Sequence, residues 1–137
     1  MADIEMASED VAAAVAAIKP GREFFMLNLL RFRDQADYGG QDFPPATGRE
    51  AYLQRYVPAF AEVAGPLGGS DLIFAGDVFA RLVGPEDEVW DVVAIAHYPN
   101  IKVFQDITSH PKYLTKAAPH RRAALADLRL IATTALG

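Results

Sequence analysis

Apolar residues recur along this chain with two different spacings, and the changes between the spacings divide it into helices and strands. Apolar residues fill most positions of the predicted strands, which are residues 24–32, 71–83, 89–98 and 127–136. Helical spacing is found in residues 8–18, in residues 47–67, and in a stretch from residue 101 that Pro111 and Pro119 divide. The predicted order is therefore helix, strand, helix, strand, strand, helix, strand.

Short polar motifs fix several of these boundaries. Ser8 is predicted to cap the first helix. Thr47 and Glu50 have the spacing of a capping box, in which each side chain bonds to the other residue's backbone N–H. Pro58 lies inside the second helix and is expected to kink it, because proline has no N–H. Residues 84–88 are predicted as a hairpin loop between two strands.

This order of elements predicts an α+β fold, the ferredoxin-like βαββαβ plait, with both helices on one face of a four-stranded antiparallel sheet. Residues 1–22 are expected to form an extra N-terminal helical extension, and residues 23–137 the ferredoxin-like domain. Residues 24–30 and 92–96 are apolar at both strand parities, so the helix-free face also requires burial. A homodimer packed sheet against sheet is therefore expected.

Composition excludes several classes of function. The chain has no cysteine, which excludes disulfides, thiol catalysis and thiolate metal sites. A net charge of −5 argues against nucleic acid and acidic membrane surfaces as partners. No apolar run approaches the roughly 20 residues that span a bilayer. The acidic start of the sequence also lacks the layout of a signal peptide, so a cytoplasmic protein is expected. Neither a metal-ligand spacing nor a glycine-rich phosphate loop is present, so no cofactor is expected.

Several short motifs occur in a characteristic order along residues 24–134. They are Phe25–Phe32, Glu50–Tyr56, Trp90-Asp91, Tyr98-Pro99, Pro111–Tyr113 and His120–Leu125. Their order resembles an uncharacterised domain-of-unknown-function family of the dimeric α/β-barrel, ferredoxin-like superfamily. The resemblance implies a dimeric α/β barrel and leaves the activity open. Other members of that superfamily include cofactor-independent monooxygenases, haem-degrading enzymes and muconolactone-type isomerases, which use pockets between sheet and helices.

Strand and helix ends bring a set of polar residues to one end of the predicted sheet. The first strand is antiparallel to the third, so its end lies beside the start of the third, and the helix before the last strand ends there too. A pocket is expected at this end, lined by Arg31, Tyr56, Trp90, Asp91, His120 and Arg121. The polar loop of residues 33–46 is expected over its mouth, whereas His97 and Tyr98 are expected at the opposite end.

These residues suggest two groups of roles. The expected catalytic residues are His120, Asn28 and Tyr56, and the expected substrate-binding residues are Arg31, Trp90, Asp91 and Arg121. Histidine titrates near neutral pH and can move a proton, while an amide or a phenol can polarise an oxygen. An arginine can hold an anionic group of a ligand.

Each residue also has a structural interpretation. Asn28 can be satisfied by a structural hydrogen bond to a loop. Arg31 and Asp91 can pair with each other, and Trp90 can pack in the core or in a dimer interface. The tyrosines can pack in the core, and His120 can interact with the dipole at the end of its helix.

Three functions fit these features. The leading hypothesis is a cofactor-independent enzyme of monooxygenase or isomerase type, with a small-molecule ligand between sheet and helices. The second is a non-catalytic ligand-binding or structural dimer. The third is a haem-binding or haem-degrading protein.

Overall fold

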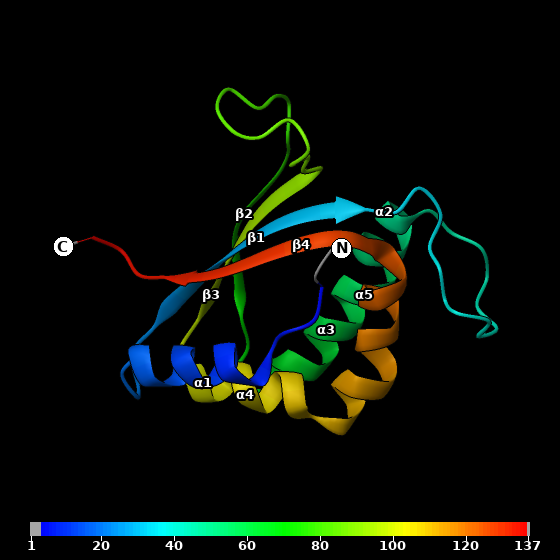
Figure 1. Ribbon diagram of the computed structural model, residues 1–137. Coiled ribbons are helices and arrows are strands. Elements are labelled where there is room, and N and C mark those ends of the chain that lie inside the picture. The colour runs from blue at the N-terminus through cyan, green and yellow to red at the C-terminus, as the bar shows by residue number, and fades with distance from the viewer. Residues whose placement is uncertain (1–3, 137) are drawn as a thin grey trace.

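A four-stranded antiparallel sheet forms the centre of the protein, whose computed structural model describes residues 4–136 (Figure 1). The strands are β1 (Phe24–Phe32), β2 (Asp71–Asp77), β3 (Val92–Tyr98) and β4 (Leu125–Thr133). They lie in the order β2-β3-β1-β4, and each neighbouring pair is antiparallel. This is the ferredoxin-like α+β plait that the order of elements predicts. Residues 1–3 and 137, which belong to the expected extension and domain, lie outside the described residues.

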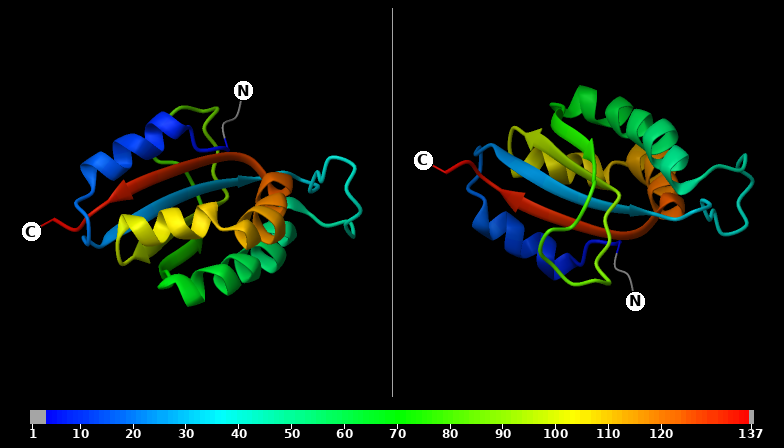
Figure 2. Two further views of the ribbon diagram at one scale, coloured as in Figure 1. Left: turned by 90° about the horizontal axis from the view of Figure 1, so that it is seen from below. Right: turned by 90° about the horizontal axis from the view of Figure 1, so that it is seen from above.

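The longer helices all cover the same face of this sheet (Figures 1 and 2). The α-helices are α1 (Ser8–Ala17), α2 (Gly48–Glu50), α3 (Val57–Ala64), α4 (Ile101–Ser109) and α5 (Ala118–Ala124). Two π-helical segments, η1 (Ala51–Tyr56) and η3 (Tyr113–Ala117), precede α3 and α5, and the 3-10 turn η2 (Gly65–Leu67) follows α3. Within residues 4–136, no helix lies on the opposite face of the sheet.

The capping box is confirmed, but the predicted cap of the first helix is wrong. The Glu50 backbone N–H donates to Thr47 Oγ1 at 3.0 Å, and the Thr47 N–H donates to Glu50 Oε1 at 2.9 Å. Ser8 is instead the first residue of α1, and the cap position is Ala7, which makes no side-chain capping bond. Backbone geometry explains the shift, because Ala7 is extended and its carbonyl accepts the first bonds of the helix.

The prolines change the type of helix at two places. The N–H of Val57, just before Pro58, reaches back five residues to the Tyr52 carbonyl. Ala118, just before Pro119, does the same with the Tyr113 carbonyl. Each proline lies in the first turn of the α-helix that continues directly from the π-helical segment. Because proline has no N–H, it leaves one backbone hydrogen bond of the continuous helix unmade, and in both places a π-helical turn directly precedes it.

The connection between β2 and β3 is longer than predicted. Residues 78–83 and 89–91, which were assigned to strands, belong to a loop of residues 78–91, hereafter the crossing loop. The Val78 N–H donates to the Asp91 carbonyl at 2.9 Å and closes the base of this loop. Figures 1 and 2 show it passing over the helix-free face of the sheet. The last strand also differs from its predicted bounds, since β4 ends at Thr133.

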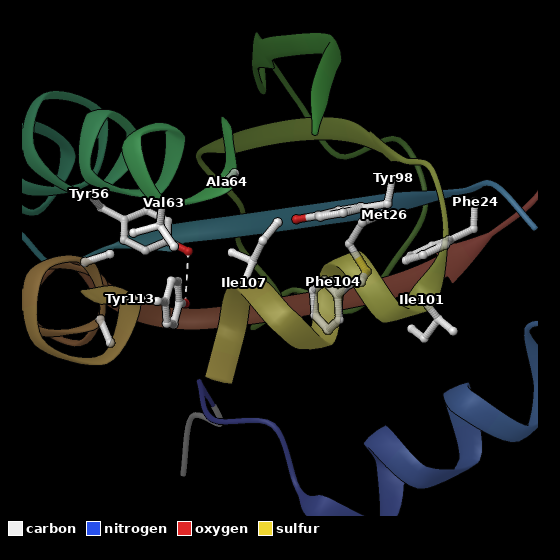
Figure 3. Close-up of a cluster of buried hydrophobic side chains, with 12 residues drawn as sticks. Phe24, Met26, Tyr56, Val63, Ala64, Tyr98, Ile101, Phe104, Ile107 and Tyr113 are labelled. Carbon is white, nitrogen blue, oxygen red and sulfur yellow. Dashed lines mark hydrogen bonds between the residues drawn. The ribbon is translucent and has the colours of Figure 1, made fainter. Parts of the chain in front are cut away.

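An aromatic core fills the space between the sheet and the helices (Figure 3). Phe24 of β1 stacks on Tyr98 of β3 with ring centroids 5.3 Å apart, and Phe104 of α4 meets both rings edge to face. A second cluster continues the core toward the far end of β1, with Leu30 and Leu125 almost fully buried. The helices therefore rest on aromatic side chains that also border the site described below.

The helix-free face of the sheet is apolar as well. Strand alternation places Leu27 opposite Ile95 and Leu29 opposite Val93 on that face. On the flanking strands, Phe74 is 55% exposed and Ile131 is 49% exposed. Apart from the crossing loop, nothing in the described chain covers this face.

Candidate functional site

Two adjoining hollows lie on the helix side of the sheet. The inner hollow has a volume of about 150 Å³ and a largely aromatic wall that includes Tyr52, Tyr56, Phe60, Tyr98, Phe104 and Tyr113. The outer hollow has a volume of about 430 Å³ and lies between α1, α4 and β4. The two share part of their walls, including Glu5, Met6 and Arg121. They therefore form a candidate site with an aromatic interior and a charged junction.

Arg121 supplies the charge at this junction. It lies in the last turn of α5 and is only 8% exposed, which makes it the one buried charged residue within residues 4–136. Its Nη2 donates to the carbonyl of Ile4, and its Nη1 lies 3.8 Å from Glu5 Oε1. The same carboxylate oxygen is 3.1 Å from Nε of Arg122. The N-terminal residues therefore meet the arginine where the two hollows join.

Tyrosine hydroxyls provide hydrogen-bond donors in the inner hollow. The hydroxyls of Tyr56 and Tyr113 lie 3.1 Å apart and point toward each other (Figure 3). Burial, and next the neighbouring Tyr113, raise the pKa of Tyr56 well above its ordinary value, so the phenol keeps its proton. Burial also raises the pKa of Tyr52, whose hydroxyl has no hydrogen-bond partner in the described part of the chain. One proton of the Tyr56–Tyr113 pair is used between the two oxygens, which leaves the other for a ligand.

Asn28 lines the inner hollow but offers an acceptor. Its Nδ2 donates to the carbonyls of Met26 at 3.0 Å and Ala94 at 3.4 Å. Because both neighbours are carbonyl oxygens, the amide nitrogen must face them, and Oδ1 remains for a ligand. Both amide hydrogens of Asn28 are therefore used within the sheet, which leaves none to polarise a substrate oxygen. The partners are strand carbonyls and not the loop that the structural interpretation expected.

His120 lies outside both hollows. Its Nδ1 is 2.7 Å from the hydroxyl of Tyr38, and Arg55 Nη1 donates to the same hydroxyl at 3.0 Å. Burial, and next the positive charge of Arg55, lower the pKa of His120. Consecutive residues of an α-helix point about 100° apart, so Arg121 faces the hollows while His120 turns toward the loop.

The loop of residues 33–46 does not cover the site. None of its residues lines either hollow, and Figures 1 and 2 show it extending past the end of the sheet. It is fastened there by Tyr38, and by the bond from the Asp37 N–H to the Ala123 carbonyl at 2.9 Å. The expected lid is therefore a separate feature of the surface.

Three further residues are not brought to the site. Arg31 is exposed, and it lies an odd number of positions from Leu30, so it projects from the helix-free face. Asp91 Oδ2 accepts the backbone N–H of Phe32 at 2.8 Å and makes no ion pair with Arg31 in the described residues. Both the predicted pocket lining and the predicted pair are therefore wrong for these residues.

Trp90 belongs to the crossing loop. The guanidinium of Arg129 lies 5.1 Å from its ring centroid, and Glu88 of the same loop is 3.8 Å from that arginine. Trp90 and Asp91 line a third hollow of about 690 Å³ formed with the loop, on the face away from the helices. Trp90 therefore joins the loop to β4, on the opposite side of the sheet from Arg121.

Sequence reasoning missed part of the site. Tyr113 and Tyr98 line the inner hollow, and both occur in motifs that carried the family resemblance. Glu5 and Met6 gave no signal, because the segment before α1 has no periodic pattern. His97 lies away from both hollows, with Nε2 2.8 Å from Glu23 Oε2. Tyr98, which was expected with it at the opposite end, lines the inner hollow instead, because consecutive strand residues point to opposite faces of the sheet.

Neither a cluster of metal-binding side chains nor a membrane-spanning helix occurs in the described part of the chain. Across residues 4–136, no group of three or more histidine, aspartate or glutamate side chains is placed to hold a metal ion. In the same part of the chain, no helix combines the length and hydropathy needed to cross a bilayer.

The chain is similar to a protein of unknown function, RPA0582 from Rhodopseudomonas palustris. In its crystal structure, 35% of residues are identical, the TM-score is 0.86, and the match covers 100% of this chain and 99% of the other. A crystal structure of the methylated protein matches with 35% identity, a TM-score of 0.81 and coverage of 99% and 96%.

A dimeric protein of unknown function with a ferredoxin-like fold, from Bacteroides fragilis, is a more distant match. It is 13% identical over 82% of this chain and 96% of the other, with a TM-score of 0.45. No family model matches the chain, and no curated protein matches it.

Proposed function

The chain belongs to the family of the Rhodopseudomonas palustris protein RPA0582, whose function is unknown, and we therefore propose its function from the site itself. It binds a small organic anion between sheet and helices, with Arg121 as the counter-ion. The inner hollow receives the body of the ligand, and the junction with the outer hollow receives its charge.

The buried guanidinium of Arg121 carries this proposal. A charged group removed from water destabilises a protein unless other charges and hydrogen bonds compensate it. Here the Ile4 carbonyl accepts one hydrogen bond, and the Glu5 carboxylate lies 3.8 Å away, beyond hydrogen-bond distance. A ligand anion can therefore supply a closer partner than the chain does.

The neighbouring groups suit an oxygen-rich ligand. The Tyr56–Tyr113 pair and Tyr52 supply phenolic protons, and Asn28 Oδ1 accepts a hydroxyl from the ligand. No histidine in the described part of the chain lines either hollow. This favours binding over acid–base catalysis by His120, and it gives the haem alternative no axial imidazole.

A cofactor-independent enzyme is the second candidate function. The arrangement of Arg121 beside neutral phenols favours it, because such donors stabilise an oxyanion that develops during a reaction. An isomerisation through an enolate would use them in this way. The same binding site serves both candidates.

We also infer that the protein is a homodimer formed through the helix-free face. Besides the apolar strands of that face, the crossing loop exposes Phe79 fully, Leu82 by 93% and Val83 by 95%. Apolar side chains exposed together in this way are typical of an interface. A second copy would bury them and the sheet face in one contact.

The binding proposal can be tested with phenyl compounds that differ only in their head group. Sodium benzoate, benzenesulfonate and phenylphosphonate are titrated against the full chain, with chemical shifts of backbone amides as the readout, and benzyl alcohol serves as the neutral control. At least one anion is expected to shift residues around the inner hollow. Arg121→Gln should weaken its binding about tenfold or more, as expected for a lost hydrogen bond to a charged group.

Arg49→Gln is the matched control, because Arg49 pairs with Asp77 on the surface and lines neither hollow. Its affinity is expected to equal that of the wild type. Equal binding by Arg121→Gln, or an absence of binding by all three anions, would contradict the proposal. Tyr56→Phe gives an independent reading, since it removes one donor and leaves the ring in the core.

A further inference from the structure

We propose that the acidic group of the ligand is a carboxylate on a ring-sized apolar body. This carboxylate displaces the carboxylate of Glu5 from its place beside Arg121. This inference rests on the proposed function and adds the class of ligand and its mode of entry. Volume, head-group geometry and the attachment of the N-terminal residues each support one part of it.

The inner hollow fits a single ring. Its volume of about 150 Å³ is close to that of cavities that accept benzene, and aromatic side chains form much of its wall. Met26, Leu128 and Leu130 add apolar contacts on the side of the sheet, beside the tyrosine hydroxyls and the amide of Asn28. A short-chain acid would leave much of this space empty and lose the contacts that a ring makes.

The groups that Arg121 already contacts indicate the chemical class of the ligand's head group. A guanidinium presents parallel N–H groups that match the two oxygens of a carboxylate. In this structure one group meets the carbonyl of Ile4, and another faces the carboxylate of Glu5 at 3.8 Å. Arg122 is closer to that carboxylate, at 3.1 Å. The chain therefore places a carboxylate beside Arg121 but not within hydrogen-bond distance of it. A ligand carboxylate can approach the guanidinium more closely.

The residues that hold Glu5 are weakly attached. We call residues 4–17 the strap, since they run from the junction of the hollows along α1 (Figure 2). No residue of α1 is buried, and the side chain of Glu5 is 57% exposed. Displacing the strap therefore costs few buried contacts. A ligand carboxylate can take the place of the Glu5 carboxylate beside Arg121, while Arg122 remains available to pair with Glu5.

The test compares ligands that share either the charge or the ring. Sodium benzoate and cyclohexanecarboxylate, acetate and benzamide are titrated into the full chain by calorimetry. The two ring carboxylates are expected to bind about tenfold or more tightly than acetate, which lacks the ring. Benzamide, which lacks the charge, is expected to bind more weakly than benzoate by a similar factor.

The exchange itself is tested with Glu5→Gln, which removes the competing charge and leaves Arg121 in place. Benzoate affinity is expected to rise about threefold or more, since the ligand no longer displaces a carboxylate. Glu9→Gln is the matched control, because Glu9 is an exposed glutamate of the same strap and makes no ion pair in the described residues. Its benzoate affinity should equal that of the wild type.

Three outcomes separate this inference from the proposed function. If acetate binds as tightly as benzoate, the proposal that the ligand carries a ring is wrong. If Glu5→Gln binds benzoate no better than Glu9→Gln does, the proposal that the ligand displaces Glu5 is wrong. If phenylphosphonate binds through Arg121 and benzoate does not, the proposed function stands and the carboxylate class fails. If no anion binds, both fail. Because Glu5 is exposed, its variant keeps the test valid even where Arg121→Gln does not fold.

Discussion

The hydroxyl of Tyr38 lies 2.7 Å from Nδ1 of His120, although 82 positions separate the two residues in the chain. Arg55 donates to the same hydroxyl at 3.0 Å, and the ring of Phe43 stacks on Tyr38 with centroids 4.4 Å apart. These contacts join the loop of residues 33–46 to α5 one position before Arg121. The histidine with the expected chemistry therefore anchors a loop, and the arginine beside it faces the site.

This contact predicts a loss of stability on acidification. Burial, and next Arg55, lower the pKa of His120 below its ordinary value of 6.5, so near that pH the unfolded chain binds a proton that the folded chain does not. Stability from neutral His120 is therefore complete above pH 6.5 and is lost as the pH falls from 6.5 through the folded-state pKa. Urea unfolding between about pH 5 and about pH 7.5 should show a smaller acid loss in His120→Asn. An equal loss of stability on acidification in the wild type and in His120→Asn would contradict this prediction.

Gly48 and Gly65 are predicted to respond to alanine with opposite signs. A Cβ on Gly48 would lie 2.2 Å from the Arg33 carbonyl oxygen and 2.6 Å from that of Ala124, so backbone must move. Gly48→Ala should cost more than about 2 kcal/mol in the free energy of unfolding. A Cβ on Gly65 meets nothing within 4 Å, and its backbone is helical, so Gly65→Ala should stabilise by about 0.4–1 kcal/mol. Denaturant unfolding of both variants decides the point.

Asn28 and Asn100 are predicted to respond differently to replacement by aspartate. Asn28 uses its amide nitrogen toward two carbonyls, whereas Asn100 uses its oxygen to cap α4 by accepting from Val103 N at 2.9 Å. Asn28→Asp sets a carboxylate against those carbonyls and should destabilise by about 2 kcal/mol near neutral pH. Lowering the pH should restore part of this, because a protonated carboxyl can donate. Asn100→Asp should stay within about 0.5 kcal/mol of the wild type. Equal effects would show that the amide of Asn28 is not a donor.

The homodimer can be tested by introducing a negative charge on each face of the molecule in turn. Phe74, on the helix-free side, is 55% exposed, and Leu53, on the helix side, is 40% exposed. Phe74→Glu should convert the dimer to a monomer, because an interface would bury the new carboxylate without a partner. Leu53→Glu should leave the mass unchanged. Light scattering coupled to size exclusion measures both, and a monomeric wild type at micromolar concentration would overturn the inference.

Strand patterns predicted the centre of the fold well and its periphery less well. Residues 24–32 were bounded correctly, because a continuous apolar run of this length between polar residues is typical of a central strand. Residues 78–83 are equally apolar but form a loop, since β3 begins only at Val92 and offers them no pairing partner. Apolar composition alone does not distinguish burial within one chain from burial against a second copy.

The site was predicted in part, for geometric reasons. Topology brought the end of α5 to the predicted pocket, and in the structure Arg121 at that end lines both hollows, but topology did not decide which of His120 and Arg121 faces inward. Strand parity was available from the sequence and separates Asn28 from Arg31, because positions three apart lie on opposite faces. The contribution of Glu5 depends on a segment with no periodic pattern, so only the structure reveals it.

The two π-helical segments have a consequence for how related chains differ in length. A π-helical turn is an α-helical turn that holds one extra residue. Deleting one residue within η1 or η3 would therefore restore an ordinary α-helix and leave the flanking turns in register. Family members one residue shorter are expected to carry their gaps at these places, directly before Pro58 or Pro119. The site tyrosines Tyr56 and Tyr113 lie at the ends of these segments, so such a gap would also reset how the two hydroxyls meet.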